Sequence, residues 1–269
     1  MQVSIRYLAQ LLNWVLLEPY VFGRTSFLRI VAIGIAVNCA QIAAHAEESS
    51  DPGRANKSAQ EQDTAAAAPV IDKIDVRPGD RWTYQVIDDI TGETKSTVVH
   101  TVTELKDKTY SVQSTFTPYG QSVGTSTLQV FDEDWNLLED QVWTQNPANP
   151  STGVQLPLKL GAQWKVHLTS SRKTPPESHF NVDATATVLA YEPVILKFNK
   201  TYDAFKLEVD ETLTNSATPS SVVTSKATMW FAPSVNRYVK RILETRVNDR
   251  LQSRGIETLI NYARRHDDN

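Results

Sequence analysis

Apolar and polar side chains alternate with a period of two residues through most of the chain after residue 70, and this pattern limits the fold more than any other feature. Successive side chains of a β-strand point to opposite faces, so the period predicts strands with one buried face. About ten to twelve such strands fit, and no amphipathic helix is predicted in the same range. The clearest segments are 82–86, 110–116, 164–168, 180–188 and 205–209.

Short runs rich in Asp, Asn, Gly and Pro separate these segments and predict turns. They lie at 88–92, 107–108, 118–120, 134–136, 146–150 and 174–176. Strands that follow one another this closely pair antiparallel, because parallel pairing needs long crossovers. A large sheet with one apolar face and no covering helices must then curl to bury that face. We therefore predict an all-β fold with little helix: a large curled antiparallel sheet, a meander forming a half-barrel or open barrel, with a folded sandwich as the alternative.

The N-terminal part has the layout of a secretory signal. A short apolar run at 30–37 follows Arg24 and Arg29 and leads to Ala44-His45-Ala46, which fits a small-residue cleavage site. The run is shorter than the roughly 20 residues that span a bilayer. We expect residues 1–46 to be a signal peptide cleaved after Ala46, and the protein to be periplasmic or secreted.

Other interpretations of the leader stay open. It is either cleaved or kept as an anchor, and Cys39 is a candidate for lipid attachment, although Asn38 stands where that signal prefers a small residue. A second apolar stretch at 7–17 makes the leader long. Translation starting near Val21 would give it an ordinary length.

Residues 47–68 contain no aromatic residue and no aliphatic residue larger than alanine. Such a segment cannot bury enough apolar surface to offset its ordering entropy, so we expect a disordered linker. Residues 69–263 are then predicted to form a single β-domain, and residues 264–269 a charged tail.

Charge and cysteine content exclude some classes of protein. The chain has 27 basic and 31 acidic residues and one cysteine. Its net charge of −4 becomes −6 when three arginines and one glutamate leave with the leader, so nucleic acid is not expected as a partner. A single cysteine excludes an internal disulfide and a cysteine-rich metal site.

Four segments in order resemble a family of exported bacterial β-domains of unknown function. They are PGDRWTY at 78–84, LPLKLGAQW at 156–164, AFKL at 204–207, and MWFAPSVNRYVKR at 229–241, which carries the W-[FY]-A-P-x-V pattern. Where the family often has glycine after the valine, this chain has Asn236, which also tolerates a positive φ. In architecture such domains are similar to periplasmic lipoprotein-carrier half-barrels that hold acyl chains. The segments consist of turn and core residues, so the resemblance implies a fold more than an activity.

Large aromatic residues recur at the inward positions of the expected strands. Eight strands give an interior just filled by side chains, so ten or more are expected to leave a wider lumen. The ligand-lining residues that we predict are Trp82, Tyr84, Trp164, Phe205 and Phe231. The alternative is that these aromatic side chains form an ordinary packed core.

No catalytic residue, metal ligand or cofactor is assigned. The sequence GQSVG at 120–124 fits the G-x-S-x-G pattern of hydrolases, but that pattern needs a helix after Ser122, and the following residues predict a strand. The acidic run at 132–136 fits the start of a calcium loop, yet Leu137 stands where the loop requires glycine. A metal pair of His100 and His167 would need both side chains on one face, and alternation turns His167 outward.

The function predicted from the sequence is that of an exported cell-envelope β-domain that binds or carries an apolar ligand or lipid in a sheet-lined cavity. A structural or interaction module with an envelope protein as partner is the alternative, and a hydrolase is the third possibility. No enzymatic activity is assigned, and the sequence contains no information about the oligomeric state.

Overall fold

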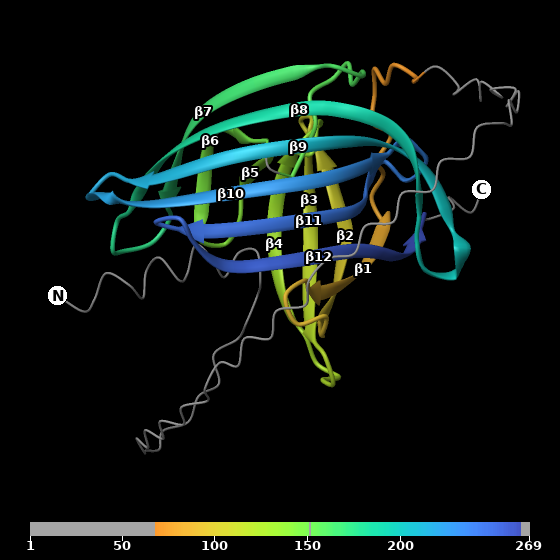
Figure 1. Ribbon diagram of the computed structural model, residues 1–269, viewed down its shortest axis with the longest axis horizontal. Coiled ribbons are helices and arrows are strands. Elements are labelled where there is room, and N and C mark those ends of the chain that lie inside the picture. The colour runs from red at the N-terminus through yellow and green to blue at the C-terminus, as the bar shows by residue number, and fades with distance from the viewer. Residues whose placement is uncertain (1–67, 151, 265–269) are drawn as a thin grey trace, which may run out of the picture. The chain divides into compact units, whose positions relative to one another are not determined.

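The computed structural model describes residues 68–150 and 152–264 (Figure 1). Several predictions fall on residues outside these ranges and stay predictions. They are the signal peptide with cleavage after Ala46, lipid attachment at Cys39, the start near Val21, the linker over residues 47–67 and the tail over residues 265–269. All residues described belong to one compact unit. No helix in this part of the chain is long and apolar enough to cross a membrane.

The described residues form twelve β-strands and two short 3-10 turns, so the all-β prediction is confirmed. The strands are β1 (Arg81–Asp88), β2 (Thr94–Lys106), β3 (Thr109–Pro118), β4 (Thr125–Asp132), β5 (Leu137–Glu139), β6 (Trp143–Asn149), β7 (Gln163–Arg172), β8 (His179–Ile195), β9 (Thr201–Asn215), β10 (Thr218–Ala232), β11 (Arg237–Val247) and β12 (Arg250–Ala263). The 3-10 turns are η1 (Lys197–Asn199) and η2 (Pro233–Val235).

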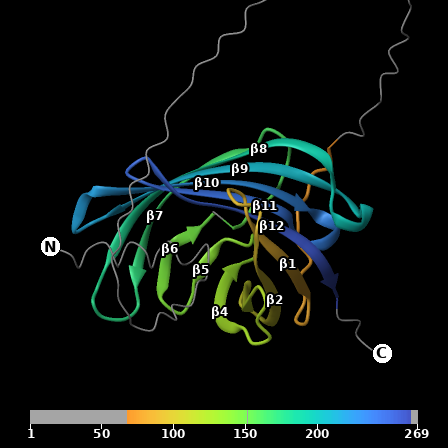
Figure 2. The same ribbon diagram turned by 60° about the horizontal axis from the view of Figure 1, so that its bottom comes forward.

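The strands make one antiparallel sheet in sequence order, and the sheet closes into a barrel. Closure comes from β1 and β12, which pair with Arg81 opposite Ala263 and Asp88 opposite Gly255. In Figure 2, β4–β6 lie opposite β8–β10 across the interior. The curled antiparallel meander is therefore confirmed, and its closure pairs the backbone groups that an open sheet leaves at two edges.

The period of two correctly identifies the buried face. In β1, Trp82, Tyr84 and Val86 are buried, whereas Arg81 is exposed. The turn predicted at 146–150 is wrong for its first four residues, which belong to β6. Asn146 pairs with Thr169 of β7, so the neighbouring strand holds this Asn- and Pro-rich segment extended against its local preference.

A packed cluster fills the end of the barrel at which β1 and β11 begin, which we call the packed end. Trp82 is fully buried there and contacts the ring of Trp135 edge to face at 5.5 Å. The segment before β1 joins the same cluster, because Ile74 and Val76 are only 5% and 4% exposed. All four segments that carry the family resemblance contribute to this cluster, through Trp82, Leu158, Phe205 and Val235.

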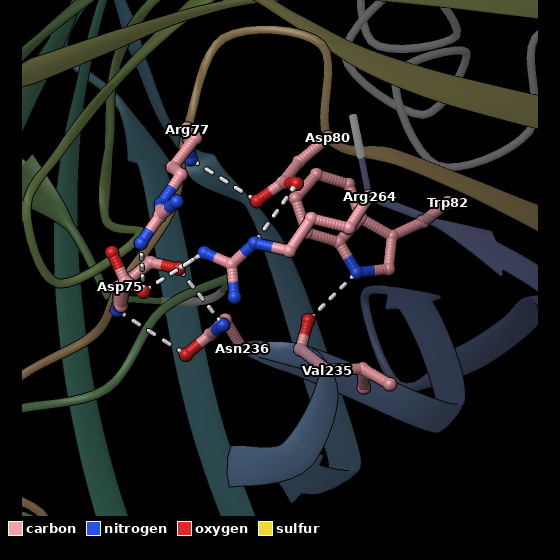
Figure 3. A network of polar contacts seen from close by, with 7 residues as sticks. All are labelled: Asp75, Arg77, Asp80, Trp82, Val235, Asn236 and Arg264. Atoms are coloured by element: carbon pink, nitrogen blue, oxygen red, sulfur yellow. Dashed lines mark hydrogen bonds and ion pairs between the residues drawn. The ribbon is translucent and has the colours of Figure 1, made fainter. Parts of the chain in front are cut away.

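Polar contacts hold the segment before β1 against the packed end (Figure 3). Nη2 of Arg264 donates to the backbone oxygen of Asp75 at 2.7 Å and to its carboxylate at 2.9 Å. The side chain of Asn236 donates to the same backbone oxygen and accepts from the Asp75 N–H. Asn236 has a φ of 55°, as its place in the turn predicts. Arg264, which we assigned to the tail, thus links the end of the sheet to the segment that precedes it.

Candidate functional site: the lumen of the barrel

A cavity of about 450 Å³ lies inside the barrel. Each of the twelve strands contributes at least one side chain to its lining, so the cavity is the lumen of the sheet. Its volume falls within the range of roughly 300–1,000 Å³ that is typical of small-molecule pockets. The predicted inward alternation therefore produces both a packed end and an unfilled space.

Much of the wall is apolar. Ring and branched side chains from strands around the barrel face the space, among them Phe116, Trp143, Leu213, Val223 and Leu243. The first two come from β3 and β6, and the others from β9, β10 and β11. Such a wall offers dispersion contacts to an apolar ligand, and its burial under a ligand removes apolar surface from water.

A charged pair on β11 and β12 interrupts this wall. Nη2 and Nε of Arg241 lie 2.9 and 3.1 Å from Oε2 of Glu257, and the Tyr238 hydroxyl donates to the same oxygen at 2.9 Å. The Arg241 and Glu257 side chains are only 13% and 15% exposed. Because each charge offsets the other away from water, removing one partner of such a pair typically costs about 3–5 kcal/mol.

Arg237, at the start of β11, is one of three arginines of the lining, with Arg172 and Arg241, and it has no such partner among the described residues. It is 4% exposed, and its Nε and Nη1 atoms make no hydrogen bond with any described residue. Its guanidinium carbon instead lies 4.2 Å from the ring centre of Trp135, with the rings of Tyr238, Trp82 and Phe131 at 5.3–5.7 Å. A guanidinium stays charged in proteins. Each contact with a ring offsets about 0.5–2 kcal/mol of the cost of burying this charge. Each buried N–H group without a hydrogen bond costs about 1–3 kcal/mol of stability.

A β-bulge explains why several polar side chains of β11 reach the lumen. The pairing of β10 with β11 shifts register between Trp230 and Phe231, which leaves an extra residue in β11. The extra residue is Val239, so Tyr238 and Arg241 lie on one face although they are three residues apart, and both line the cavity. Arg237, the first residue of β11 after the η2 turn, lines it as well. Sequence analysis missed these residues because simple alternation puts neighbours on opposite faces. The only available signal was their position at the end of the 229–241 segment.

His100 of β2 begins a hydrogen-bonded chain within the lining. Its Nδ1 lies 2.7 Å from Oγ of Ser114, and that hydroxyl donates to Oε1 of Gln129. Because the serine proton is used on Gln129, Nδ1 of His100 is assigned as the donor. Burial lowers the pKa of His100 well below its usual 6.5, and the charges of Arg237 and Arg241 lower it further. The imidazole is therefore neutral at pH 7.

Two acidic side chains also border the cavity, and both accept hydrogen bonds from residues other than the lumen arginines. Oε1 of Glu211 accepts from the Asn149 side chain at 2.9 Å. Oδ1 of Asp140 accepts from the backbone N–H groups of Val142 and Trp143. Burial raises the pKa of both Glu211 and Asp140. Among the described residues, neither forms an ion pair with a lumen arginine.

The five predicted ligand-lining residues lie outside the lining of this cavity. Trp82, Tyr84, Phe205 and Phe231 are buried in the packed cluster, and Trp164 is partly buried against it. The structure thus brings them together as neighbours in the core. That they contact a ligand stays a prediction, and the cavity itself is lined by other residues.

The hydrolase and calcium motifs lie in turns. Ser122 is exposed in the loop before β4, and a strand follows it as expected. The carboxylate of Asp132 accepts from the backbone N–H groups of Asp134 and Asn136 and from the Asn136 side chain, so its oxygens close their own turn.

The proposed histidine pair does not form. His100 lies in the lumen, whereas His167 is on the outer face beside Asp183. Within residues 68–150 and 152–264, no group of three or more His, Cys, Asp and Glu side chains could hold a metal ion.

No protein-family model and no curated protein matches the chain. Similar solved structures include a Bacteroides fragilis protein named as exported, with a YmcC-like fold, and a Parabacteroides distasonis protein named as a lipoprotein. The first is 12% identical, covers 74% of this chain and 100% of its own, and has a TM-score of 0.45. The second is 10% identical, covers 70% and 96%, and has a TM-score of 0.47. With both TM-scores below 0.5, nothing about the function of this chain follows from them.

Proposed function

We propose that this chain is an exported cell-envelope β-domain that binds an apolar ligand or lipid in the lumen of its barrel. The cavity of about 450 Å³, lined from all twelve strands, is the observation that carries the proposal. Protein interiors normally contain few voids larger than a water molecule. An unfilled space of this size inside a closed sheet therefore favours a binding role over a purely structural one.

The character of the wall supports the choice of ligand. Ligand pockets are usually apolar with a few placed polar groups, and this lining follows that pattern. Phe116, Leu213 and Leu243 offer apolar surface, while Arg237 and His100 supply polar atoms. A structural or interaction module of the envelope is the alternative if the space proves unable to bind.

Export is the second part of the proposal, and it rests on the leader. The apolar run at 30–37 and the Ala44-His45-Ala46 motif support cleavage after Ala46. Intact mass of protein recovered from the cell envelope should correspond to a chain that begins at Glu47. A retained leader, or recovery from the cytoplasm alone, would contradict this part.

Dye titration of a blocked lumen tests the binding part. The neutral dye N-phenyl-1-naphthylamine should bind the mature protein saturably. Leu213→Trp places a much larger side chain inside the lumen and should abolish that binding. Leu189→Trp is the matched control, because Leu189 is 46% exposed on the long strand β8, outside the cavity lining. If the dye shows no fluorescence increase with the wild-type protein, the result favours the interaction module. Equal dye binding by the two variants favours it as well.

A further inference from the structure

The unpartnered cation in the lumen suggests which chemical class of ligand the cavity takes. Arg237 lines the cavity, is 4% exposed, and has buried Nε and Nη1 atoms without a hydrogen-bond partner among the described residues. Aromatic rings offset part of its charge, but they provide no oxygen or nitrogen acceptor. A ligand in the cavity can supply such an acceptor.

Other charged groups of the lining leave this position positive. Arg241 is neutralised by Glu257 through two contacts to one carboxylate oxygen. His100 is neutral at pH 7 and also lines the cavity. Glu211 is bound by Asn149, so it is committed elsewhere. The carboxylates that line the cavity, Asp140, Glu211 and Glu257, form no ion pair with Arg237, so its guanidinium has no counter-charge among the described residues.

We propose that Arg237 binds the anionic oxygen group of an amphipathic ligand, a carboxylate or a phosphate, while the apolar chain of that ligand lies along the lumen. This inference rests on the proposed function and adds the head group to it. The planar guanidinium fork suits both groups, because each offers two oxygens to parallel N–H donors.

The geometry of β11 agrees with this orientation. Arg237 is the first residue of β11, beside the packed end, and Leu243 lies six residues further along the strand. Six residues span roughly 20 Å in a strand. A ligand with its charged group at Arg237 would therefore direct its chain away from the packed end, toward Leu243 and Val223, which also line the cavity.

Four ligands that share a twelve-carbon alkyl chain and differ in their head group test the inference on the wild-type mature protein. Dodecanoate, dodecyl phosphate, 1-dodecanol and dodecyltrimethylammonium compete against the neutral dye at pH 8. We expect at least one anion to displace the dye at a concentration about tenfold or more below that of dodecanol. The tighter anion identifies the carboxylate or the phosphate as the head group.

Failure of this inference is distinguishable from failure of the proposed function. Equal displacement by all four compounds, or stronger binding of the cation, overturns the anion site and leaves the apolar cavity standing. If the wild-type protein does not bind the dye at all, the proposal of an apolar binding cavity is itself overturned.

Variants locate the site. Arg237→Met should remove the preference for the anion while keeping dodecanol binding, and Arg237→Lys should restore part of the preference. Arg254→Met is the control, since Arg254 is 45% exposed and contacts Asp89. An Arg237→Met protein that keeps the full preference overturns the assignment.

A second measurement serves if Arg237→Met does not fold. Dodecanoate labelled with ¹³C at the carboxyl carbon is bound to wild-type protein and titrated by NMR. Contact with a buried cation should hold the bound carboxylate ionised below the pH at which free dodecanoate is protonated. A bound signal that titrates together with the free ligand overturns the proposal.

Discussion

The indole N–H of Trp82 donates a hydrogen bond to the backbone oxygen of Val235 at 2.8 Å, although 153 positions separate the two residues. Trp82 begins the inward face of β1, and Val235 ends the η2 turn between β10 and β11. The bond joins two segments on which the family resemblance rests. Both side chains are buried, so the contact helps to close one end of the barrel.

Replacing Trp82 with phenylalanine should therefore destabilise the fold. Loss of the donor leaves a buried carbonyl without this partner, which costs about 1–3 kcal/mol in addition to lost packing. Urea unfolding of Trp82→Phe measures the change in the free energy of unfolding. Trp164→Phe is the control, because Trp164 is only partly buried and should change stability less. Equal losses in the two variants would contradict a special role for the Trp82 bond.

The segment before β1 should be required for stability, whereas the expected linker should be dispensable. A chain that begins at Pro69 keeps Ile74 and Val76 and should melt like the chain that begins at Glu47. A chain that begins at Pro78 loses both buried side chains, worth about 1.5–3 kcal/mol each, together with the Asp75 contacts. The midpoints of thermal unfolding of the three chains test this prediction. A lower midpoint for the Pro69 chain would show that residues 47–68 stabilise the domain.

The contribution of His100 to stability should fall as the pH drops below about 6.5. Burial lowers the pKa of His100 in the folded state, so the unfolded chain binds a proton there that the folded chain does not. The contribution of His100 to the free energy of unfolding is therefore fully present above pH 6.5. It is lost as the pH falls toward the pKa of the folded state, by up to about 1.4 kcal/mol per pH unit.

The variant His100→Gln isolates that contribution, with His167→Gln on the outer face as the reference. Denaturant unfolding between pH 5 and 8 should give a shallower pH dependence for His100→Gln. Several carboxyls that are at least partly buried have raised pKa values and act in the opposite direction, and comparison between the two variants cancels their effect. They are Asp80, Asp132, Asp134, Asp140 and Glu211. Identical slopes in the two variants would contradict the prediction.

Ser122 should have no catalytic role. It is exposed in a loop that leads into β4, without the helix that a nucleophile turn requires. A serine-directed fluorophosphonate probe should leave the protein unlabelled, as judged by intact mass. Ser122→Ala should bind the neutral dye as the wild type does. Stoichiometric labelling at Ser122 would support the hydrolase instead.

The fold could be predicted further than the site. Alternation identified the buried faces of β1, β3 and β9, and turn residues separated most of the strands. The prediction failed at 146–150, where pairing with β7 keeps Asn146 in a strand. Sequence analysis missed Arg241 because the bulge that puts it on the same face as Tyr238 depends on the pairing of β10 with β11. It missed Arg237 because this residue directly follows the η2 turn at the start of β11.

The sequence by itself determined an antiparallel all-β domain, because a period of two and short turns are local properties of the chain. It also indicated Trp82 and Phe205 as inward-facing residues. Only the tertiary structure decided that β1 pairs with β12, that these aromatic residues fill one end, and that the space beyond contains Arg237. Closure and lumen volume depend on contacts between residues far apart in the chain, and no local pattern records such distances.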